Sequence, residues 1–239
     1  MSNVSISTNK LTIGYGETVI QRDITFSLNA GEMVCMLGPN GCGKSTLLRT
    51  LAGLQPALGG DYTHSDAKNI ALVLTERLSM DNTTVHDVVA LGRYPYSSFL
   101  DGLKAEDENI IEDSLHQVGF ADSSVSQTFF NAHSDGEKQR ILIAKALAQQ
   151  TPIILLDEPT AHLDLPHRIL ILRLLRTLAH EQGKTILIST HELDLALALS
   201  DRILLMTPGL GIQLDIAENL RKTDAFTSAF GMDIFNPLG

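Results

Sequence analysis

The nine residues at 38–46 are Gly38-Pro39-Asn40-Gly41-Cys42-Gly43-Lys44-Ser45-Thr46, and they directly follow an apolar run at 33–37. They match G-x-x-x-x-G-K-[ST], which between a strand and a helix is typical of a phosphate-binding loop. Glycines let successive backbone N–H groups turn inward around an anion, and the dipole of the following helix adds attraction. Lys44 is expected to reach the β- and γ-phosphates, and the Ser45 hydroxyl to ligate magnesium. A glycine-rich turn without a ligand is the alternative interpretation. The expected nucleotide contacts in this loop are Gly38, Asn40, Gly41, Cys42, Gly43, Lys44, Ser45 and Thr46.

The composition is that of a soluble globular protein. The chain has 239 residues, 44% of them hydrophobic, which is enough for one large or two small domains with a sizeable core. No run approaches the roughly 18 to 20 apolar residues of a membrane helix, and the N-terminus has no apolar signal core, so a cytosolic location is expected. Cys35 and Cys42 are expected to be reduced thiols. The net charge is −10 with no basic cluster, which gives a nucleic-acid partner no electrostatic footprint.

The pattern before the loop predicts an antiparallel β-layer at 4–30, because its runs are short and alternating. Tyr15 lies there on a turn between two glycines, where its ring could stack on a nucleotide base; covering a sheet edge is the alternative. After the loop a helix ends near Gly53, and 69–74 is a short apolar run that predicts a strand. Residues 57–68 read as a polar connection between the two.

Helical patterns dominate 75–149. Thr84 can cap one helix, a second covers 105–118, and Ser134-Asp135-Gly136-Glu137 forms a capping box that opens a third. Strand and helix patterns then alternate, which predicts a parallel sheet with ligands at the carboxyl ends of its strands. We therefore expect an α/β fold with a parallel sheet flanked by helices. The expected organisation is one domain at 1–239, with a core of 1–74 and 150–239, an antiparallel β-subdomain at 4–30, and an inserted α-helical subdomain at about 75–149.

Three residues at strand ends carry the expected chemistry. Asp157 closes the apolar run at 153–157, where a second magnesium ligand is needed. Glu158 follows it and is placed to activate a water that attacks the γ-phosphate. His191 lies just beyond the predicted strand at 185–189, where it could contact that phosphate or hold the water. A capping carboxylate pair and a solvated histidine are the alternatives.

These residues, in this order, resemble the nucleotide-binding subunit of ATP-binding cassette transporters. Residues 38–45 resemble the Walker A motif of that family, 153–157 Walker B, Glu158 its catalytic glutamate, and His191 its switch histidine. Tyr15 matches the aromatic position that stacks on adenine. Residues 161–164 resemble the D-loop, which in the family couples two nucleotide sites across a dimer and here ends in Asp164. The resemblance implies a P-loop NTPase core.

Two segments depart from the family pattern. The signature is usually L-S-G-G-Q, and at 133–137 only Ser134 and Gly136 match it. In the family this turn caps the ATP of the opposite subunit, so the acidic residues Asp135 and Glu137 lead us to expect weak or partner-dependent closure. A glutamine that ligates magnesium and senses the permease is replaced by Glu76, with Thr75 as the second choice. A carboxylate can ligate magnesium but cannot donate a hydrogen bond as an amide does.

The resemblance implies an ATPase that binds ATP and Mg²⁺ and powers an importer of an iron-siderophore, haem or cobalamin type of substrate. Its implied partners are a second copy of this chain and two transmembrane permease subunits, with an external substrate-binding protein acting indirectly and no nucleic acid. The implied location is the cytoplasmic side of the inner or plasma membrane, held through the permease. Residues 93–96 would lie near the groove that receives the permease, or would pack internally. The alternatives are a soluble mechanical ATPase that acts on nucleic acid or ribosomes, and a degenerate cassette that mainly binds ATP.

Overall fold

A mostly parallel six-stranded sheet forms the centre of the protein, as seen in the computed structural model, which describes residues 4–64, 69–74, 81–96, 102–209 and 211–235. The strand order is β5-β6-β7-β3-β8-β9, and only β9 is antiparallel to its neighbour. Every residue of β3, β6 and β7 is buried, which explains their unbroken apolar sequences. The strands are β3 (Met33–Leu37), β5 (Ile70–Val73), β6 (Ile153–Asp157), β7 (Thr185–Ser189), β8 (Arg202–Thr207) and β9 (Gly211–Asp215).

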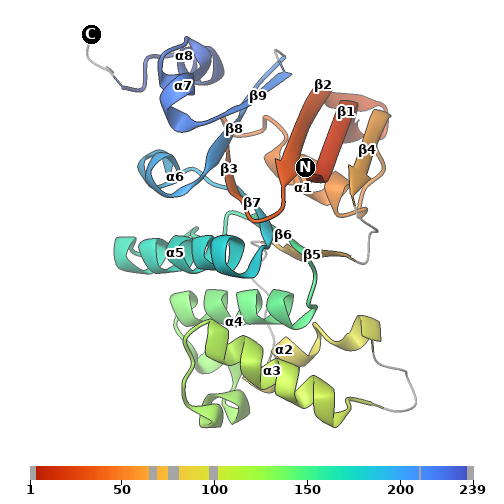
Figure 1. Ribbon diagram of the computed structural model, residues 1–239, viewed down its shortest axis with the longest axis vertical. Helices are drawn as coiled ribbons and strands as arrows, with labels where there is room; N and C mark the ends of the chain where they lie inside the picture. Colours follow the sequence, from red (N-terminus) through yellow and green to blue (C-terminus); the bar gives the residue numbers. More distant parts are fainter. Residues whose placement is uncertain (1–3, 65–68, 75–80, 97–101, 210, 236–239) are drawn as a thin grey trace.

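A second sheet of three antiparallel strands covers part of this core (Figure 1). Its order is β2-β1-β4, with β1 at Val4–Tyr15, β2 at Thr18–Asn29 and β4 at Gly59–His64. The prediction of an antiparallel layer at 4–30 is confirmed. The reading of 57–68 as a mere connection is wrong, because 59–64 pairs with β1. This strand lies at the sheet edge with mostly exposed residues, so it needs no apolar alternation in its sequence.

Alternate residues of the central strands face two separate cores. Val34, Met36 and Leu155 pack with the antiparallel sheet and with α1 (Lys44–Leu51). Cys35 and Leu156 pack on the other side, against the remaining helices. Because successive side chains of a strand point to opposite faces, both faces must be covered by apolar partners. The further helices are α2 (Val85–Ala90), α3 (Ala105–Gln117), α4 (Asp135–Ala148), α5 (Leu165–Gln182), α6 (Leu193–Leu199), α7 (Ala217–Arg221) and α8 (Ala225–Phe230).

Helix starts follow the capping signals of the sequence. Thr84 and Asp87 form a reciprocal capping box at α2, which confirms the predicted cap. Ser134 and Glu137 do the same at α4. Asp164 caps α5 by accepting a hydrogen bond from the backbone N–H of the residue three positions later, and a proline follows in the first turn.

Helices α2, α3 and α4 form the helical end of the molecule, separated from the antiparallel sheet in Figure 1. The buried guanidinium of Arg93 joins them, since its Nε donates to Asp107 Oδ1 at 2.8 Å and its Nη1 donates to the Ala148 carbonyl at 2.9 Å. Hydrogen bonds from the Lys104 backbone and from Arg93 hold the pKa of Asp107 below its usual value. In the described part of the chain, no helix is both long enough and apolar enough to cross a membrane.

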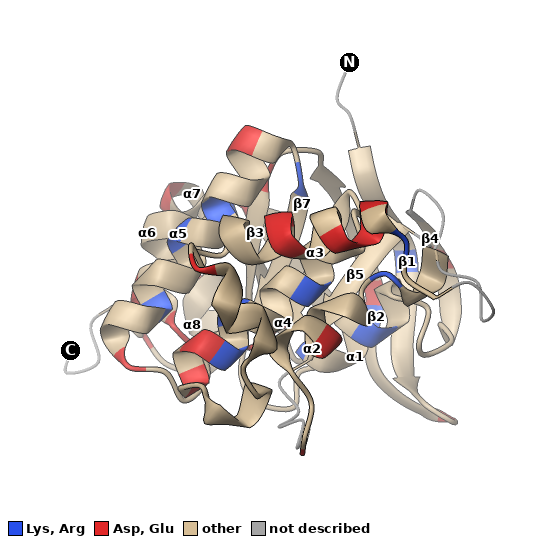
Figure 2. Cartoon of the chain, turned by 90° about the horizontal axis from the view of Figure 1, so that it is seen from below, with Lys and Arg blue, Asp and Glu red and all other residues tan. Residues whose placement is uncertain are grey.

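Charged residues of both signs are interspersed over the helical surface. On the face drawn in Figure 2, acidic residues are spread over α3 and neighbouring helices, with single basic residues between them. This distribution fits the net charge of −10.

Replacing Leu155 by Ala is expected to destabilise the protein by about 2–5 kcal/mol, because this fully buried residue of β6 would leave a cavity in the central sheet. Urea unfolding followed by circular dichroism measures the change. Leu170→Ala is the matched control, since Leu170 lies on α5 with 48% of its surface exposed and should change stability by at most about 0.5 kcal/mol. Equal losses for the two variants would contradict the position of β6 in the core.

Candidate functional site

The loop at 38–43 joins β3 to α1 in a conformation that requires glycine at two positions. A Cβ on Gly38 would lie 2.7 Å from the Met206 carbonyl oxygen, which is backbone and cannot give way. Gly43 has φ 106°, in the left-handed region, and a Cβ there would lie 2.9 Å from the Ile20 side chain. The loop is therefore packed between β2 and β8. Its free side is formed by Asn40 and Gly41, which are exposed.

The Lys44 ammonium lies over this loop. Its Nζ donates to the Gly38 carbonyl at 2.9 Å and to the Pro39 carbonyl at 3.2 Å, and the residue is buried. Ser45 follows in the first turn of α1 and is half-buried. One cation, a hydroxyl and the N-terminus of α1 thus meet at the carboxyl end of β3, which is an arrangement suited to phosphate.

Tyr15 is attached to the end of the same loop. The Thr46 hydroxyl lies 3.2 Å from the Tyr15 hydroxyl, although half of the Tyr15 surface is exposed. The tyrosine ring is therefore close to the loop and open to solvent, as a base-stacking ring must be. Cys42 is buried beneath the loop, and burial raises the pKa of its thiol, which favours the unreactive protonated form.

Asp157 and Glu158 lie at the end of β6, beside the end of β7. The Ser189 hydroxyl donates to Asp157 Oδ1 at 2.5 Å and accepts from the Glu158 backbone N–H at 2.9 Å. A second bond runs from the same N–H to the Ser189 carbonyl at 3.1 Å. Glu158 has φ 47°, a left-handed conformation that costs a non-glycine residue of order 1 kcal/mol. The two hydrogen bonds from its N–H to Ser189 hold the residue in that conformation.

His191 meets that carboxylate. Its Nε2 lies 2.6 Å from Glu158 Oε1, and both side chains are partly exposed. The chain reaches this point because β7 pairs in parallel with β6 and β3, and the Thr190 N–H donates to the Met36 carbonyl at 3.1 Å. The predicted juxtaposition of residues 157, 158 and 191 is thus present at one edge of the sheet.

Ser134 and Gly136 lie together in the first turn of α4. The Ser134 hydroxyl donates to Glu137 Oε2 at 2.7 Å, and its N–H donates to the same oxygen at 3.0 Å. These bonds hold the pKa of the Glu137 carboxyl below its usual value, so the carboxylate is ionised at neutral pH. The negative charge expected from the sequence is therefore present. The Glu137 carboxylate that carries it accepts a hydrogen bond from the Ser134 hydroxyl.

Arg140 offsets this charge at the start of the helix only in part, because its guanidinium is bound elsewhere. Its Nη1 donates to the Val118 carbonyl at 3.1 Å, and its guanidinium lies 4.4 Å from the centre of the Phe120 ring. The nearer basic group is His133, whose Nδ1 is 3.7 Å from Glu137 Oε2.

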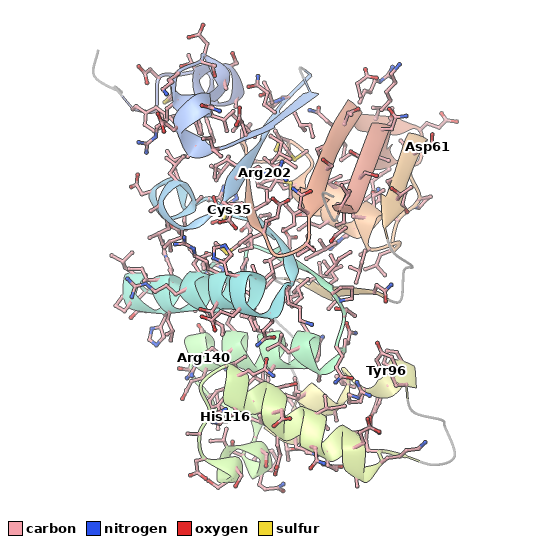
Figure 3. All side chains as sticks on the ribbon, viewed as in Figure 1. Cys35, Asp61, Tyr96, His116, Arg140 and Arg202 are labelled. Atoms are coloured by element: carbon pink, nitrogen blue, oxygen red, sulfur yellow. The ribbon has the colours of Figure 1, made fainter. Side chains whose placement is uncertain are left out.

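Residues 93–96 form a turn that is buried at its first residue and exposed at its two tyrosines. Arg93 packs internally, whereas Tyr94 and Tyr96 are 60% and 51% exposed. The Tyr96 hydroxyl donates to the Gln149 carbonyl at 2.8 Å, so the exposed turn is attached to the end of α4. Figure 3 places Tyr96 at the helical end of the molecule, away from Cys35 in the central sheet.

The predicted metal ligand Glu76 and its alternative, Thr75, lie outside the described residues. Ser189, in contrast, is a site residue that the sequence reading missed. The available signal was a serine at the end of a buried strand. Its role became visible only from the parallel pairing of β6 and β7, which places Ser189 beside Asp157.

A family model and the similar proteins of known sequence point to the same protein family. Residues 21–161 match the ABC transporter family. The iron(3+)-hydroxamate import ATP-binding protein FhuC of Bacillus subtilis is 37% identical over 240 residues, which cover 96% of this chain and 88% of that protein. The ferric enterobactin transport ATP-binding protein FepC of Escherichia coli is 36% identical over 214 residues, which cover 84% of this chain and 77% of that protein.

Two solved structures are similar to this one. A structure described as an inward-facing metal-chelate type ABC transporter has a TM-score of 0.87 and 29% identity, with 96% of this chain and 90% of that chain covered. A dimeric bacterial ABC transporter cassette has a TM-score of 0.74 and 25% identity, with coverage of 89% and 98%.

Replacing Ser189 by Ala is expected to lower ATP turnover about tenfold, which corresponds to about 1.4 kcal/mol, because Asp157 and the Glu158 backbone lose a shared buried partner. Steady-state phosphate release measures turnover, and ATP binding should change little. Ser228→Ala, on the exposed side of α8, is the control and should turn over as the unchanged protein does. Unaltered turnover in the Ser189 variant would show that this hydroxyl does not order the site.

Proposed function

Because this chain belongs to the ABC transporter family and is an ATP-hydrolysing subunit of that family, we propose that it powers the uptake of an iron-siderophore type of substrate through membrane permeases. The family relationship also favours transport over the alternatives of a mechanical ATPase acting on nucleic acid or ribosomes. The observation that carries hydrolysis, as opposed to binding alone, is the Glu158–His191 pair beside Asp157.

Nucleotide binding is proposed for the loop at 38–46 together with Tyr15. Backbone N–H groups of the loop surround the β-phosphate, and Lys44 turns from the loop carbonyls to the β- and γ-phosphates. This exchange of partners is favourable because a phosphate oxygen is charged and a carbonyl oxygen is not. Tyr15 stacks on the base, and its link to Thr46 keeps the ring beside the loop.

Water activation is proposed for Glu158. Its carboxylate accepts the proton of the attacking water, since it lies at the carboxyl end of β6 with its backbone fixed by Ser189. His191 orients this carboxylate and the γ-phosphate, because a ring nitrogen within hydrogen-bond distance of Glu158 can also donate to a phosphate oxygen.

A magnesium ion is proposed at Ser45 and Asp157. A hydroxyl and a buried carboxylate are oxygen donors of the kind that this ion prefers. Asp157 is the last residue of β6, and Ser45 follows β3, which ends at the same edge of the sheet. When bound, the ion supplies positive charge to the β- and γ-phosphates. The contribution of Glu76 to this ion remains a prediction from the sequence.

A second copy of the chain is the proposed partner that completes each site. Ser134 and Gly136 lie on the first turn of α4, and in a head-to-tail dimer they would face the ATP of the opposite copy. Asp164, in the D-loop, would lie in the same interface. Support comes from the dimeric cassette, which this chain resembles over 89% of its length. Neither copy then has a complete site of its own, so turnover depends on association.

Two permease subunits are the proposed membrane partners, with an external substrate-binding protein acting through them. The exposed rings of Tyr94 and Tyr96 offer an aromatic contact at the helical end, on a turn that Arg93 anchors from within. Attachment through the permeases would place the chain at the cytoplasmic face of the membrane. We also propose that the single domain at 1–239 has a core of 1–74 and 150–239 and an inserted helical subdomain at about 75–149.

An iron-siderophore cargo follows from the relatives. FhuC is described as acting in iron(3+)-hydroxamate import and FepC in ferric enterobactin transport. Haem and cobalamin are the related cargoes to compare in transport assays.

Replacing Glu158 by Gln is expected to lower steady-state ATP turnover at least about 100-fold, because an amide cannot accept the proton of the attacking water. Phosphate release and ATP binding are measured on the same preparation, and binding should persist. Glu181→Gln, an exposed change near the end of α5, controls for lost charge. Unchanged ATP turnover in the Glu158 variant would contradict the assignment of Glu158 as the residue that activates water.

Replacing Glu137 by Gln is expected to lower, several-fold, the chain concentration needed for half-maximal turnover. The change removes a negative charge that lies 2.7 Å from the Ser134 hydroxyl, where the partner's phosphate would bind. Glutamine can also serve in a capping box, so α4 should keep its stability. Glu112→Gln on the exposed face of α3 is the control. A higher concentration requirement would mean that the carboxylate helps closure instead of opposing it.

A further inference from the structure

The first turn of α5 touches three of the loops that form the proposed site. The helix begins after its cap, Asp164, which ends the D-loop. The side chains of His167 and Arg168, one position apart, reach in different directions from this turn.

Arg168 holds two loops with one guanidinium group. Its Nε donates to the Leu163 carbonyl of the D-loop at 2.6 Å, and its Nη1 pairs with Glu192 Oε1. About 30% of the Arg168 side chain and 29% of the Glu192 side chain are exposed, so the pair is largely shielded from solvent. The rigid fork of a guanidinium makes both contacts at once, which a flexible ammonium does less well.

Glu192 carries this connection to the hydrolytic pair. It follows His191 directly, and its backbone N–H donates to the Thr190 hydroxyl at 3.0 Å. The segment is a tight turn between β7 and α6, so a shift of Glu192 must move His191 as well. Since His191 Nε2 lies 2.6 Å from Glu158 Oε1, the position of Arg168 bears on the geometry of water activation.

His167 carries the connection to α4. Its Nδ1 contacts the Asp164 carboxylate, and this hydrogen bond holds the pKa of Asp164 below its usual value. The ring lies against Gly136, where an added Cβ would come within 2.7 Å of His167 Cδ2. Figure 1 shows α4 and α5 side by side, and this contact joins their first turns. Glycine at 136 therefore gives the imidazole room to support the turn that also carries Ser134.

We propose that His167 and Arg168 are positioning residues. They fix the switch loop of one ATP site, which is His191 and Glu192, relative to the signature turn of the other site, which is Ser134 to Gly136. The inference rests on the proposed function, in which Gly136 serves the ATP of the opposite copy while His191 serves the ATP of its own. The two residues are adjacent in one helical turn, so a movement of His191 is passed to Gly136 through α5. Each site is thereby linked to the other within a single chain.

The first test is a double-mutant cycle in the full chain, with MgATP as the ligand. Arg168→Gln and Glu192→Gln should each lower kcat about tenfold, and the double variant should also lose about tenfold instead of about 100-fold, because both residues act through one contact. Binding of ATP by the dilute chain should not change, and the melting temperature should stay within about 3 °C. Arg168→Lys should fall between the unchanged protein and Arg168→Gln.

Arg176→Gln is the matched control for charge, since Arg176 lies on the exposed side of the same helix, and it should turn over normally. His167→Ala tests the second contact. It should raise the chain concentration at half-maximal turnover several-fold while changing kcat at saturating chain concentration less than Arg168→Gln does.

The proposal would be overturned if kcat of the double variant fell by the product of the two single losses, because Arg168 and Glu192 would then act independently. A loss of kcat in Arg176→Gln equal to that in Arg168→Gln would also overturn it. A loss of kcat that only follows a loss of melting temperature would also overturn it, because the residues would then merely stabilise the fold. Failure of the proposed function looks different, since the unchanged chain would then hydrolyse no ATP at any concentration.

Discussion

The parallel pairing of β6, β7 and β3 is the constraint on which the rest of the structure depends. It brings three strand ends to one edge of the sheet, and each end supplies a different chemical group: Lys44 after β3, Glu158 after β6 and His191 after β7. None of these groups is close to the others in the sequence. The hydrogen bonds of Ser189 to Asp157 and to the Glu158 backbone then fix the Asp157 side chain and the Glu158 main chain relative to the neighbouring strand. A slip of one residue between β6 and β7 would turn these side chains to the opposite face.

The same edge is the basis for our proposal that a single chain holds only part of each site. The loop at 38–46 and the Glu158–His191 pair come from the sheet, whereas Ser134 and Gly136 come from α4, whose first turn packs against the first turn of α5. In the proposed dimer these two sets of residues serve different ATP molecules. The ionised Glu137 holds the Ser134 hydroxyl in the structure of the single chain, so the partner's phosphate must compete with an internal carboxylate. Closure is then opposed locally and has to be favoured by contacts elsewhere in the dimer or by the permeases.

Much of this was predictable from the sequence, because the signals are local. Buried strands such as β3 and β6 are unbroken apolar runs, the loop at 38–46 has a strict pattern, and the caps Thr84 and Ser134 lie three residues before their acidic partners. Strand β4 was missed because an exposed edge strand is held mainly by backbone hydrogen bonds, which leave no pattern of apolar side chains. Ser189 and Arg168 were missed for another reason, since their partners lie 32 and 24 residues away and are defined only by the pairing of strands and the packing of α5.

The central claim, that each site is built from two copies, is tested most directly by mixing two inactive variants. Lys44→Ala disables the phosphate loop but keeps the signature turn, and Ser134→Arg disables the signature turn but keeps the loop and the contact between Gly136 and His167. Each variant alone should hydrolyse ATP at least about 100-fold more slowly than the unchanged chain. An equimolar mixture should regain turnover, because a mixed dimer contains one intact site formed by the loop of one copy and the signature turn of the other. A mixture no more active than its two components would contradict the account.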